Sequence, residues 1–349
     1  MNYILCDTPN IEKFYPFTLT RPLGEMRVFG GTLKELWEKK LGCKVSYFTR
    51  DYLIDLYPVK FEKKNIILHP LGILDSQFDK QIDFDYDADE PLDKLVELIQ
   101  NNYLDKNNSF KLSSFLSNYI RPFIKIDYSG SRLDCSDNDL LNDDDGPIIV
   151  EDDVTIMEGA MIRGPVYIGQ GSVIKMGAKI YGPVVIGPYC KLGGEISHCV
   201  FLGYSNKAHD GFLGHSIIGE WCNIGAGTSN SNLKNDYSYV KMWDYSVKSF
   251  KETEEQFLGL YMGDHSKCAI NTSFNTGTTI GVNCNIFGAG FPRNFIPSFS
   301  WGGAQGIRPY KFSKAVAVAK KVMLRRNINI EEKYIKMLQF VHDITLTMK

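Results

Sequence analysis

The sequence lacks long apolar runs and has no marked excess of charge of either sign. No stretch approaches the roughly 18 consecutive apolar residues of a membrane-spanning helix. The first residues lack the basic segment and apolar run of a signal peptide. The formal net charge is -2, so the charge balance does not favour nucleic acid or a membrane surface as a partner. We therefore expect a cytoplasmic protein that binds small molecules.

Cysteine occurs at eight positions, but no two cysteines have the C-x-x-C spacing. That spacing is typical of zinc sites, and regularly spaced cysteines are typical of the disulfide frameworks of small secreted proteins. The scattered pattern disfavours both. We expect reduced thiols and no structural metal site.

The length of 349 residues suits two domains, or one domain joined to a repeat array. Residues 1–135 alternate short apolar strands with helical patterns, which predicts a small α/β domain. Residues 136–147 are rich in Asp and Asn and form a predicted linker. Residues 292–349 are predicted to form a loop followed by helices, which we expect to cap the open end of the repeat array.

An aliphatic residue recurs at every sixth position after the linker. These positions are Val150, Ile156, Ile162, Ile168, Ile174, Ile180, Ile186 and Leu192. Their spacing differs from the period of about 3.6 of a helix and the period of about 2 of a strand. It is typical of hexapeptide repeats, whose coil has three flat faces of about six residues each. The sequence therefore predicts a left-handed parallel β-helix over residues 148–291.

The repeat is interrupted at three places. Its phase slips by four residues before Ile196 and again before Phe212, with Leu202 and Ala208 as the predicted inward positions between the two slips. An irregular excursion covers residues 230–257, after which the period returns. Segments that leave a regular scaffold often carry function, so the excursion is a candidate lid or subunit contact.

The strongest local signal lies within the interrupted coils. The stretch Asn206-Lys207-Ala208-His209 is followed by Asn223-Ile224-Gly225-Ala226-Gly227-Thr228, with Asn232 beyond it. This segment resembles the acetyltransferase half of the bifunctional N-acetylglucosamine-1-phosphate uridyltransferase/glucosamine-1-phosphate acetyltransferase family. The resemblance covers residues 148–232, and the later coils are similar in pattern only.

The resemblance implies acetyl transfer from acetyl-CoA to the amine of an amino-sugar phosphate similar to glucosamine-1-phosphate, within nucleotide-sugar and cell-envelope biosynthesis. It also implies a homotrimer. The predicted site comprises the base His209, the sugar-binding residues Asn223, Asn232, Lys207 and Arg163, and the acetyl-CoA-binding residues Gly225, Ala226 and Gly227. The family's sugar-phosphate arginine and its paired lysine have no clear counterpart, since Tyr181 and either Ser197 or His198 stand near those places. The identity of the sugar therefore stays open.

The chemistry of the reaction explains these residue types. Amide formation needs a neutral amine, so a base that works near pH 7 must take a proton from the ammonium group, and histidine suits this role. A Gly-Ala-Gly corner lets a ligand approach backbone N–H groups that stabilise an oxyanion. Sugar phosphate needs cations, and several lie on or near the coils: Arg163, Lys175, Lys191 and Lys207. Three further histidines near loops are alternative bases: His198, His215 and His265.

The N-terminal region resembles the nucleotidyltransferase half of the same family only faintly. It offers Thr18-Leu19-Thr20-Arg21-Pro22 and a second arginine, Arg27, but no Gly-rich loop. The two arginines are candidates for binding nucleotide phosphates, and pairing with carboxylates is the alternative. A Mg²⁺-dependent sugar-1-phosphate nucleotidyl transfer from UTP or dTTP is thus a second possible activity. The third possibility is a non-catalytic trimeric scaffold.

Overall fold

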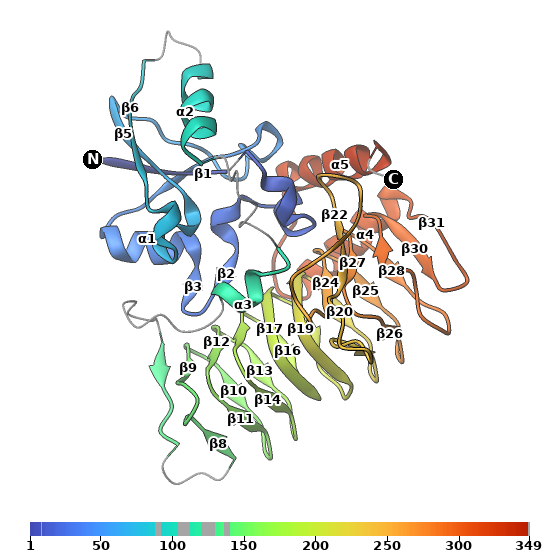
Figure 1. Ribbon diagram of the computed structural model, residues 1–349. Helices are drawn as coiled ribbons and strands as arrows, with labels where there is room; N and C mark the ends of the chain where they lie inside the picture. Colours follow the sequence, from blue (N-terminus) through green and yellow to red (C-terminus); the bar gives the residue numbers. More distant parts are fainter. Residues whose placement is uncertain (8, 88–91, 104–111, 120–129, 136–139, 348–349) are drawn as a thin grey trace.

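The computed structural model describes residues 1–349 except 8, 88–91, 104–111, 120–129, 136–139 and 348–349. An N-terminal α/β region is followed by a β-solenoid of about 9 turns over residues 141–302 and by C-terminal helices (Figure 1). The predicted fold class is confirmed, and the solenoid extends beyond the predicted residues 148–291 at both ends. No helix among the described residues is long and apolar enough to cross a membrane.

The N-terminal region is built on a four-stranded sheet with the order β4-β1-β5-β6. Its strands are β1 (Asn2–Cys6), β4 (Ser46–Phe48), β5 (Lys64–Leu68) and the antiparallel β6 (Gln81–Asp85). Its helices are α1 (Leu33–Leu41), α2 (Asp93–Tyr103) and α3 (Phe115–Tyr119). Helix α1 begins at a capping box between Thr32 and Glu35, which satisfies backbone N–H groups of the first turn. A short β2–β3 pair (Arg27–Val28, Gly31–Thr32) precedes that helix.

Three faces of parallel strands form the solenoid. The first face continues a nine-stranded sheet: β10 (Thr155–Ile156), β13 (Val173–Ile174), β16 (Lys191–Leu192), β18 (Asn206–Lys207), β20 (Asn223–Ile224), β25 (Lys267–Cys268), β28 (Asn285–Ile286), β30 (Ser300–Gly303) and the antiparallel β31 (Gly306–Pro309). The second face contains β9 (Ile148–Val150), β12 (Val166–Ile168), β15 (Val184–Ile186), β24 (Leu260–Met262), β27 (Thr278–Ile280) and β29 (Phe295–Ile296), with the antiparallel β7 (Ser131–Arg132) at its edge. The third face contains β8 (Leu141–Asn142), β11 (Met161–Arg163), β14 (Lys179–Tyr181), β21 (Ser229–Asn230) and β26 (Ser273–Phe274). Two long strands, β17 (Glu195–Gly203) and β19 (Phe212–Glu220), continue from the third face into the second.

The predicted phase is wrong between the two slips. Phe201 stacks between Ile186 and Ile218, and Lys207 pairs with Leu192. The inward residues are therefore Phe201 and Lys207, one position before the predicted Leu202 and Ala208. Correspondingly, Leu213 rather than Phe212 pairs with Ile196.

The cause of this shift is a shorter corner. In the preceding turn two residues, Gly182 and Pro183, form the corner between the third face and the second. The register shows this, since Tyr181 pairs with Ser197 before the corner and Val185 pairs with Val200 after it. In the next two turns a single residue makes this corner, His198 at φ 53° and then His215 at φ 49°. A left-handed residue turns the chain sharply, so one corner residue suffices and the spacing drops from six to five.

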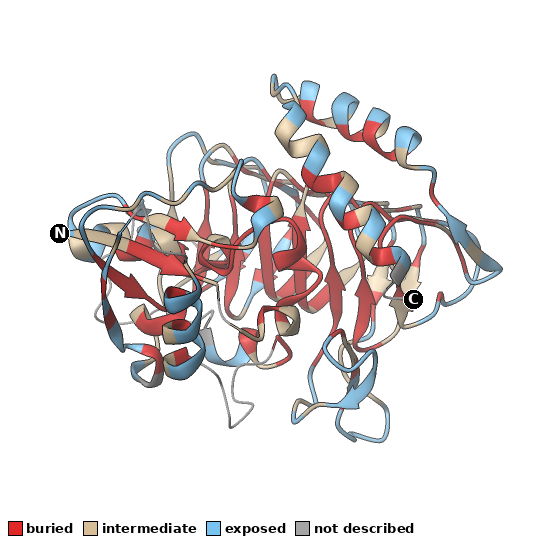
Figure 2. Cartoon of the chain, turned by 90° about the horizontal axis from the view of Figure 1, so that it is seen from above, coloured by how far each residue is buried: buried red, intermediate tan, exposed pale blue. Residues whose placement is uncertain are grey.

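The N-terminal region and the solenoid share one hydrophobic core. Aromatic rings from both sides meet there, with Phe29 5.6 Å from Tyr167 and Phe17 6.4 Å from Tyr261 between ring centroids. Figure 2 shows this buried layer running between the two parts of the chain. The α/β region is thus packed along the flank of the solenoid.

The excursion at residues 230–257 contains the hairpin β22–β23 (Lys241–Asp244, Ser249–Glu252). Trp243 stacks on Phe295 with 4.0 Å between ring centroids, and Tyr245 packs against Tyr15 of the N-terminal region at 5.5 Å. The described part of the excursion therefore makes its contacts within the chain.

The C-terminal helices α4 (Phe312–Leu324) and α5 (Glu332–Thr347) do not cap the solenoid end as predicted. Phe340 of α5 stacks on Tyr52 of the N-terminal region at 4.0 Å, and the Tyr334 hydroxyl lies 2.9 Å from Nε2 of His265. The edge of the nine-stranded sheet is instead formed by the antiparallel β30–β31 hairpin. The helices pack along the solenoid because their apolar faces are buried against its flank.

Candidate active site on the first face of the solenoid

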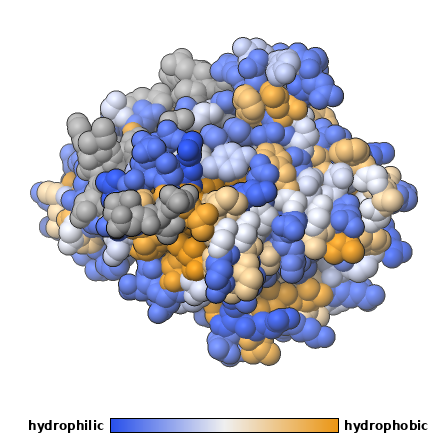
Figure 3. Space-filling view, turned by 90° about the horizontal axis from the view of Figure 1, so that it is seen from below, coloured by the Kyte–Doolittle hydropathy of each residue, from blue (hydrophilic) through white to orange (hydrophobic). Residues whose placement is uncertain are grey.

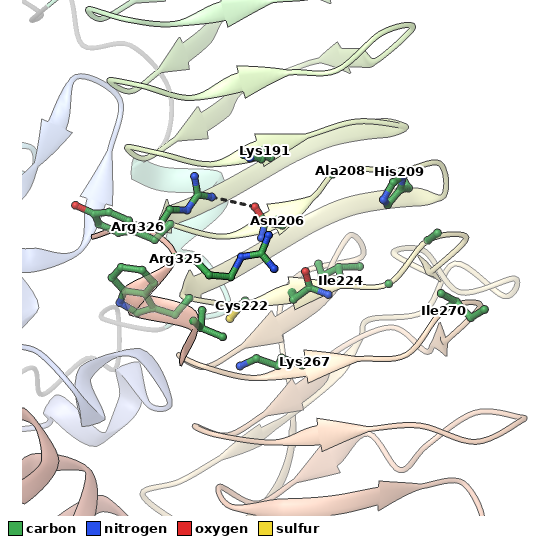
Figure 4. A pocket seen from close by; sticks show the side chains of 16 residues that line it. Lys191, Asn206, Ala208, His209, Cys222, Ile224, Lys267, Ile270, Arg325 and Arg326 are labelled. Atoms are coloured by element: carbon green, nitrogen blue, oxygen red, sulfur yellow. Dashed lines mark hydrogen bonds between the residues drawn. The ribbon is translucent and has the colours of Figure 1, made fainter. Parts of the chain in front are cut away.

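A cavity of about 580 Å³ lies on the outer side of the first face, near the middle of the solenoid (Figure 4). Its floor is a ladder of outward residues on adjacent strands, in the order Lys191, Asn206, Asn223 and Lys267. Side chains alternate between the two sides of a strand. The polar residues of this ladder therefore alternate with the inward residues of the solenoid.

One rim of the cavity is the corner that comes after these strands. His209, Ala226 and Ile270 each stand two residues after an inward residue of consecutive turns, so they lie along the same edge. The His209 side chain is exposed. Among the described residues, the Ala226 N–H donates no hydrogen bond, while the Ala226 carbonyl accepts one from the Asn271 N–H at 2.8 Å. An imidazole and a free backbone N–H are thus neighbours on one rim.

The opposite rim is aromatic and basic. Tyr204 and Trp221 stack at 4.2 Å between ring centroids, and both line the cavity. The end of helix α4 brings Arg325 and Arg326 over the floor, and Nη2 of Arg326 donates a hydrogen bond to Oδ1 of Asn206 at 3.2 Å. Figure 4 shows both arginines reaching from the helix towards the strands.

Four of the predicted site residues come together in this cavity: His209, Asn223, Gly225 and Ala226. Gly225 has a structural reason to be glycine, because a Cβ there would lie 2.4 Å from the Ala269 carbonyl carbon of the next turn. Gly227 lies just beyond the cavity, and its N–H donates to the Asp210 carbonyl at 2.9 Å.

Lys207 does not bind substrate as predicted. It points into the solenoid and is 1% exposed, and its Nζ donates to the carbonyls of Gly193 at 3.0 Å and His209 at 2.7 Å. Burial lowers the pKa of Lys207 to about 8, an effect that the charge of Asp210 partly opposes. The ammonium group thus supports the backbone of the corner that carries His209.

Asn232 and Arg163 also lie outside the cavity. Asn232 is at the shortened corner, with Nδ2 2.8 Å from Nδ1 of His215. The His215 ring stacks between His198 at 4.4 Å and Phe257 at 4.9 Å. Arg163 lies on β11, three turns before His209, with Nη1 3.9 Å from Asp145.

Two of the alternative bases are in unsuitable environments. Burial, with a smaller effect of His198, lowers the pKa of His215 to about 4, so it is a weak base at neutral pH. His265 is 2% exposed, and burial holds its pKa well below the ordinary value. His198 lies at the shortened corner, outside the cavity.

The two N-terminal arginines face the solenoid. Arg21 is 4% exposed and forms ion pairs with Glu220, at 2.9 Å, and with Asp264. Arg27 donates from Nε to the Leu202 carbonyl at 3.3 Å. Arg27 also pairs with Glu35 at 3.7 Å, so both arginines form the carboxylate pairs that were the alternative to phosphate binding.

Helix α4 and the later turns contribute three cavity residues that the sequence did not predict, Lys267, Arg325 and Arg326. Arg325 and Arg326 fall within the predicted C-terminal helices, and their only signal in the sequence is a pair of arginines after an apolar helical pattern. Lys267 lies beyond the excursion, where the resemblance rests on pattern alone. The two arginines reach the cavity because helix α4 folds back along the solenoid, and Lys267 reaches it because β25 stacks next to β20.

Two family models match this chain, one over the N-terminal α/β region and one over the first turns of the solenoid. Residues 3–142 match the family model described as sugar nucleotidyl transferase, and residues 147–182 match the one described as bacterial transferase hexapeptide (six repeats). The chain thus joins a segment that matches the sugar nucleotidyl transferase model to a segment that matches the hexapeptide model. The resemblance seen in the sequence is thereby confirmed.

The chain is also similar to curated proteins that are named as bifunctional. The bifunctional protein GlmU of Methanocaldococcus jannaschii is 34% identical over 190 residues, which are 52% of this chain and 46% of that protein. A bifunctional sugar-1-phosphate nucleotidylyltransferase/acetyltransferase of Sulfurisphaera tokodaii is 34% identical over 145 residues, which are 41% of this chain and 35% of that protein. The chain therefore spans about half, or less, of the length of these relatives.

Among solved structures, a putative acetyltransferase of Bacillus cereus aligns with a TM-score of 0.33 and 13% sequence identity. The alignment covers 58% of this chain and 96% of that chain. At this TM-score the likeness carries no weight for the function.

Proposed function

We propose that this protein transfers an acyl group, acetyl from acetyl-CoA, to the amine of an amino-sugar phosphate similar to glucosamine-1-phosphate. The observation that carries the proposal is the position of His209 beside the Ala226 N–H and Asn223 on one cavity. The name of the Sulfurisphaera tokodaii relative, which includes an acetyltransferase activity, supports it.

The geometry suits amide formation. The neutral amine of the sugar attacks the thioester carbonyl, so a C–N bond forms, and His209 accepts the surplus proton of the nitrogen. The Ala226 N–H donates to the oxyanion of the tetrahedral intermediate. The C–S bond then breaks with its electron pair on sulfur, and His209 returns the proton to the CoA thiolate. Asn223, exposed on the floor of the cavity, orients the sugar.

We also propose that the active form is a trimer, as the resemblance implies. Large apolar side chains are exposed on the solenoid edge that bears His209, with Met176 and Ile270 each 68% exposed. The underside of the molecule shows apolar patches among polar side chains (Figure 3). Such exposed apolar surface is often covered by a partner. Light scattering after size-exclusion chromatography tests this, and a monomeric mass would contradict it.

The proposed reaction is tested by release of the CoA thiol from acetyl-CoA in the presence of a panel of amino-sugar phosphates. We expect His209→Ala to reduce turnover about 10²–10⁴-fold, the usual contribution of a general base. His198→Ala is the matched control, because that histidine lies outside the cavity. If His209→Ala retained full turnover at saturating acetyl-CoA, the proposal would fail. Loss in His198→Ala alone would assign the base to the shortened corner.

Nucleotidyl transfer by the N-terminal region is the second candidate, favoured by the family match over residues 3–142. A cavity of about 240 Å³ lies where β1 and β4 end, beside Asp7, Thr49 and Arg50. Asp7 does not fit a Mg²⁺ ligand, because it is paired with Arg50 and accepts hydrogen bonds from Thr49 and from the Leu23 N–H. Incubation with UTP or dTTP, Mg²⁺ and a sugar phosphate would decide, since pyrophosphate release is required for this activity.

The third candidate is a scaffold without an active acyl site. A ligand that binds only the folded state must raise the melting temperature. Failure of saturating acetyl-CoA to do so would favour the scaffold over acyl transfer by the solenoid.

A further inference from the structure

The cavity has a strongly one-sided charge. It is lined by four cationic side chains, Lys191, Lys267, Arg325 and Arg326, and by no Asp or Glu among the described residues. None of the four forms an ion pair within the described part of the chain. The whole chain has a net charge of -2, so this concentration of unpaired positive charge is local.

The four cations come from two parts of the chain. Lys191 and Lys267 are three strand spacings apart on the floor, which corresponds to about 14 Å at roughly 4.8 Å per strand. Arg325 and Arg326 extend from the end of α4 between them (Figure 4). Asn206 holds the Arg326 guanidinium through its Oδ1. This contact leaves most donors of the guanidinium available.

We propose that Lys191, Lys267, Arg325 and Arg326 form a binding site for a diphosphate group. Four cationic side chains on one cavity suit the charge of two linked phosphates better than that of one. Arginine binds phosphate oxygens with two parallel N–H donors, which favours this pairing. This site would hold the diphosphate of a ligand used in the proposed acyl transfer. Its link to a reaction rests on that proposed function, whereas diphosphate binding itself does not.

One ligand can reach both the diphosphate site and His209. Asn206, which contacts Arg326, is three residues before His209 along the same strand and corner, about 10 Å at roughly 3.3 Å per residue. A diphosphate occurs both in CoA and in a nucleotide-linked amino sugar. These two sources carry different groups beyond the phosphates, pantetheine in CoA and the sugar in the nucleotide-linked compound, so binding measurements can distinguish them.

The test is isothermal titration calorimetry of the full chain with four probes: inorganic pyrophosphate, CoA, pantetheine and UDP-glucosamine. We expect wild type to bind pyrophosphate, to bind CoA or UDP-glucosamine more tightly, and to bind pantetheine weakly, because pantetheine has no phosphate. The double variant Arg325→Gln/Arg326→Gln is expected to weaken pyrophosphate binding at least tenfold. Whichever of CoA and UDP-glucosamine binds wild type more tightly identifies the source of the diphosphate.

The matched control is Lys320→Gln/Lys321→Gln, which removes the same charge from exposed positions of α4 that do not line the cavity. It is expected to bind like wild type, and melting temperatures confirm that both variants are folded. The site is rejected if wild type binds no phosphate-bearing probe, if the arginine variant binds all probes like wild type, or if the control weakens binding equally.

These outcomes separate the site from the reaction. Binding that depends on the arginines, without acyl transfer to any amino sugar, would support the site and contradict the proposed function. If the arginine variant kept both acyl transfer and its affinity for CoA and UDP-glucosamine, the result would support the proposed function and contradict the site.

Discussion

The Nζ of Lys207 donates a hydrogen bond to the backbone carbonyl of His209 at 2.7 Å from within the solenoid. A buried lysine thus supports the corner that carries the proposed base. The equivalent inward residues of the adjacent turns are the aliphatic Leu192 and Ile224. Lysine at this position is costly to bury, which indicates that the corner needs a donor there.

Replacement of this lysine should affect the reaction more than the fold. We expect Lys207→Met to change the free energy of unfolding by only about 1 kcal/mol, because relief of the buried charge offsets the two lost hydrogen bonds. Turnover should fall about tenfold, since His209 is positioned less well. Denaturant unfolding and the thiol-release assay measure the two effects. Ile224→Met is the control at the next turn, and equal loss of turnover there would argue against a positioning role.

Diphosphate binding should weaken as the pH rises through about 8. Burial lowers the pKa of Lys267 to about 8, so its ammonium group attracts an anion below that pH and is neutral above it. Affinity for UDP-glucosamine, whose diphosphate diester does not titrate in this range, is therefore expected to fall between pH 7 and 9. Calorimetry across that range measures it.

Lys267→Met supplies the control for this pH dependence. The Lys267→Met variant should bind UDP-glucosamine less tightly than wild type at pH 7. It should also lose the fall in affinity that wild type shows around pH 8. The amine of glucosamine also titrates, so UDP-glucose is titrated in parallel. An identical pH profile in wild type and Lys267→Met would exclude Lys267 as the titrating group.

The buried pair of Arg21 and Asp264 should be essential for stability. Asp264 is fully buried and also accepts a hydrogen bond from the Thr20 hydroxyl at 2.7 Å. Arg21→Met leaves this carboxylate without its main cation and should cost about 3–5 kcal/mol of unfolding free energy. Denaturant unfolding tests this, with Arg132→Met as control, because Arg132 pairs with Asp143 on the surface and such pairs contribute about 0–1 kcal/mol.

A double variant distinguishes the lost pair from lost packing. Arg21→Met/Asp264→Asn removes both charges, so it should be more stable than Arg21→Met alone. Equal or greater destabilisation in the double variant would show that the ion pair is not the main contribution of Arg21.

The solenoid should not be stable without the N-terminal region. A fragment of residues 140–349 would expose the apolar face that includes Tyr167, Val200, Ile217 and Tyr261, all 0% exposed in the full chain. We expect this fragment to aggregate or to bind an apolar dye such as ANS, whereas the full chain does not. A fragment that stays dispersed, with the melting temperature of the full chain, would contradict a shared core.

The repeat region could be recognised from the sequence because its evidence is local. Each aliphatic residue of a six-residue period occupies the same place on the next face, so Ile156, Ile174 and Leu192 stack regardless of the rest of the chain. His209, Asn223 and Ala226 could be placed together for the same reason, since they belong to consecutive turns. The α/β pattern of residues 1–135 is likewise a local signal.

The positions of Lys207, Arg21, Arg325 and Arg326 were decided only by the tertiary structure. A single left-handed corner residue, His198, shifts the phase by one and turns Lys207 inward, and the period alone does not show which corners are short. The arginines contact residues far away in the chain. Arg21 pairs with Asp264, about 240 residues later, and Arg326 bonds to Asn206, 120 residues earlier. Such contacts depend on the packing of whole apolar faces, which no local pattern specifies.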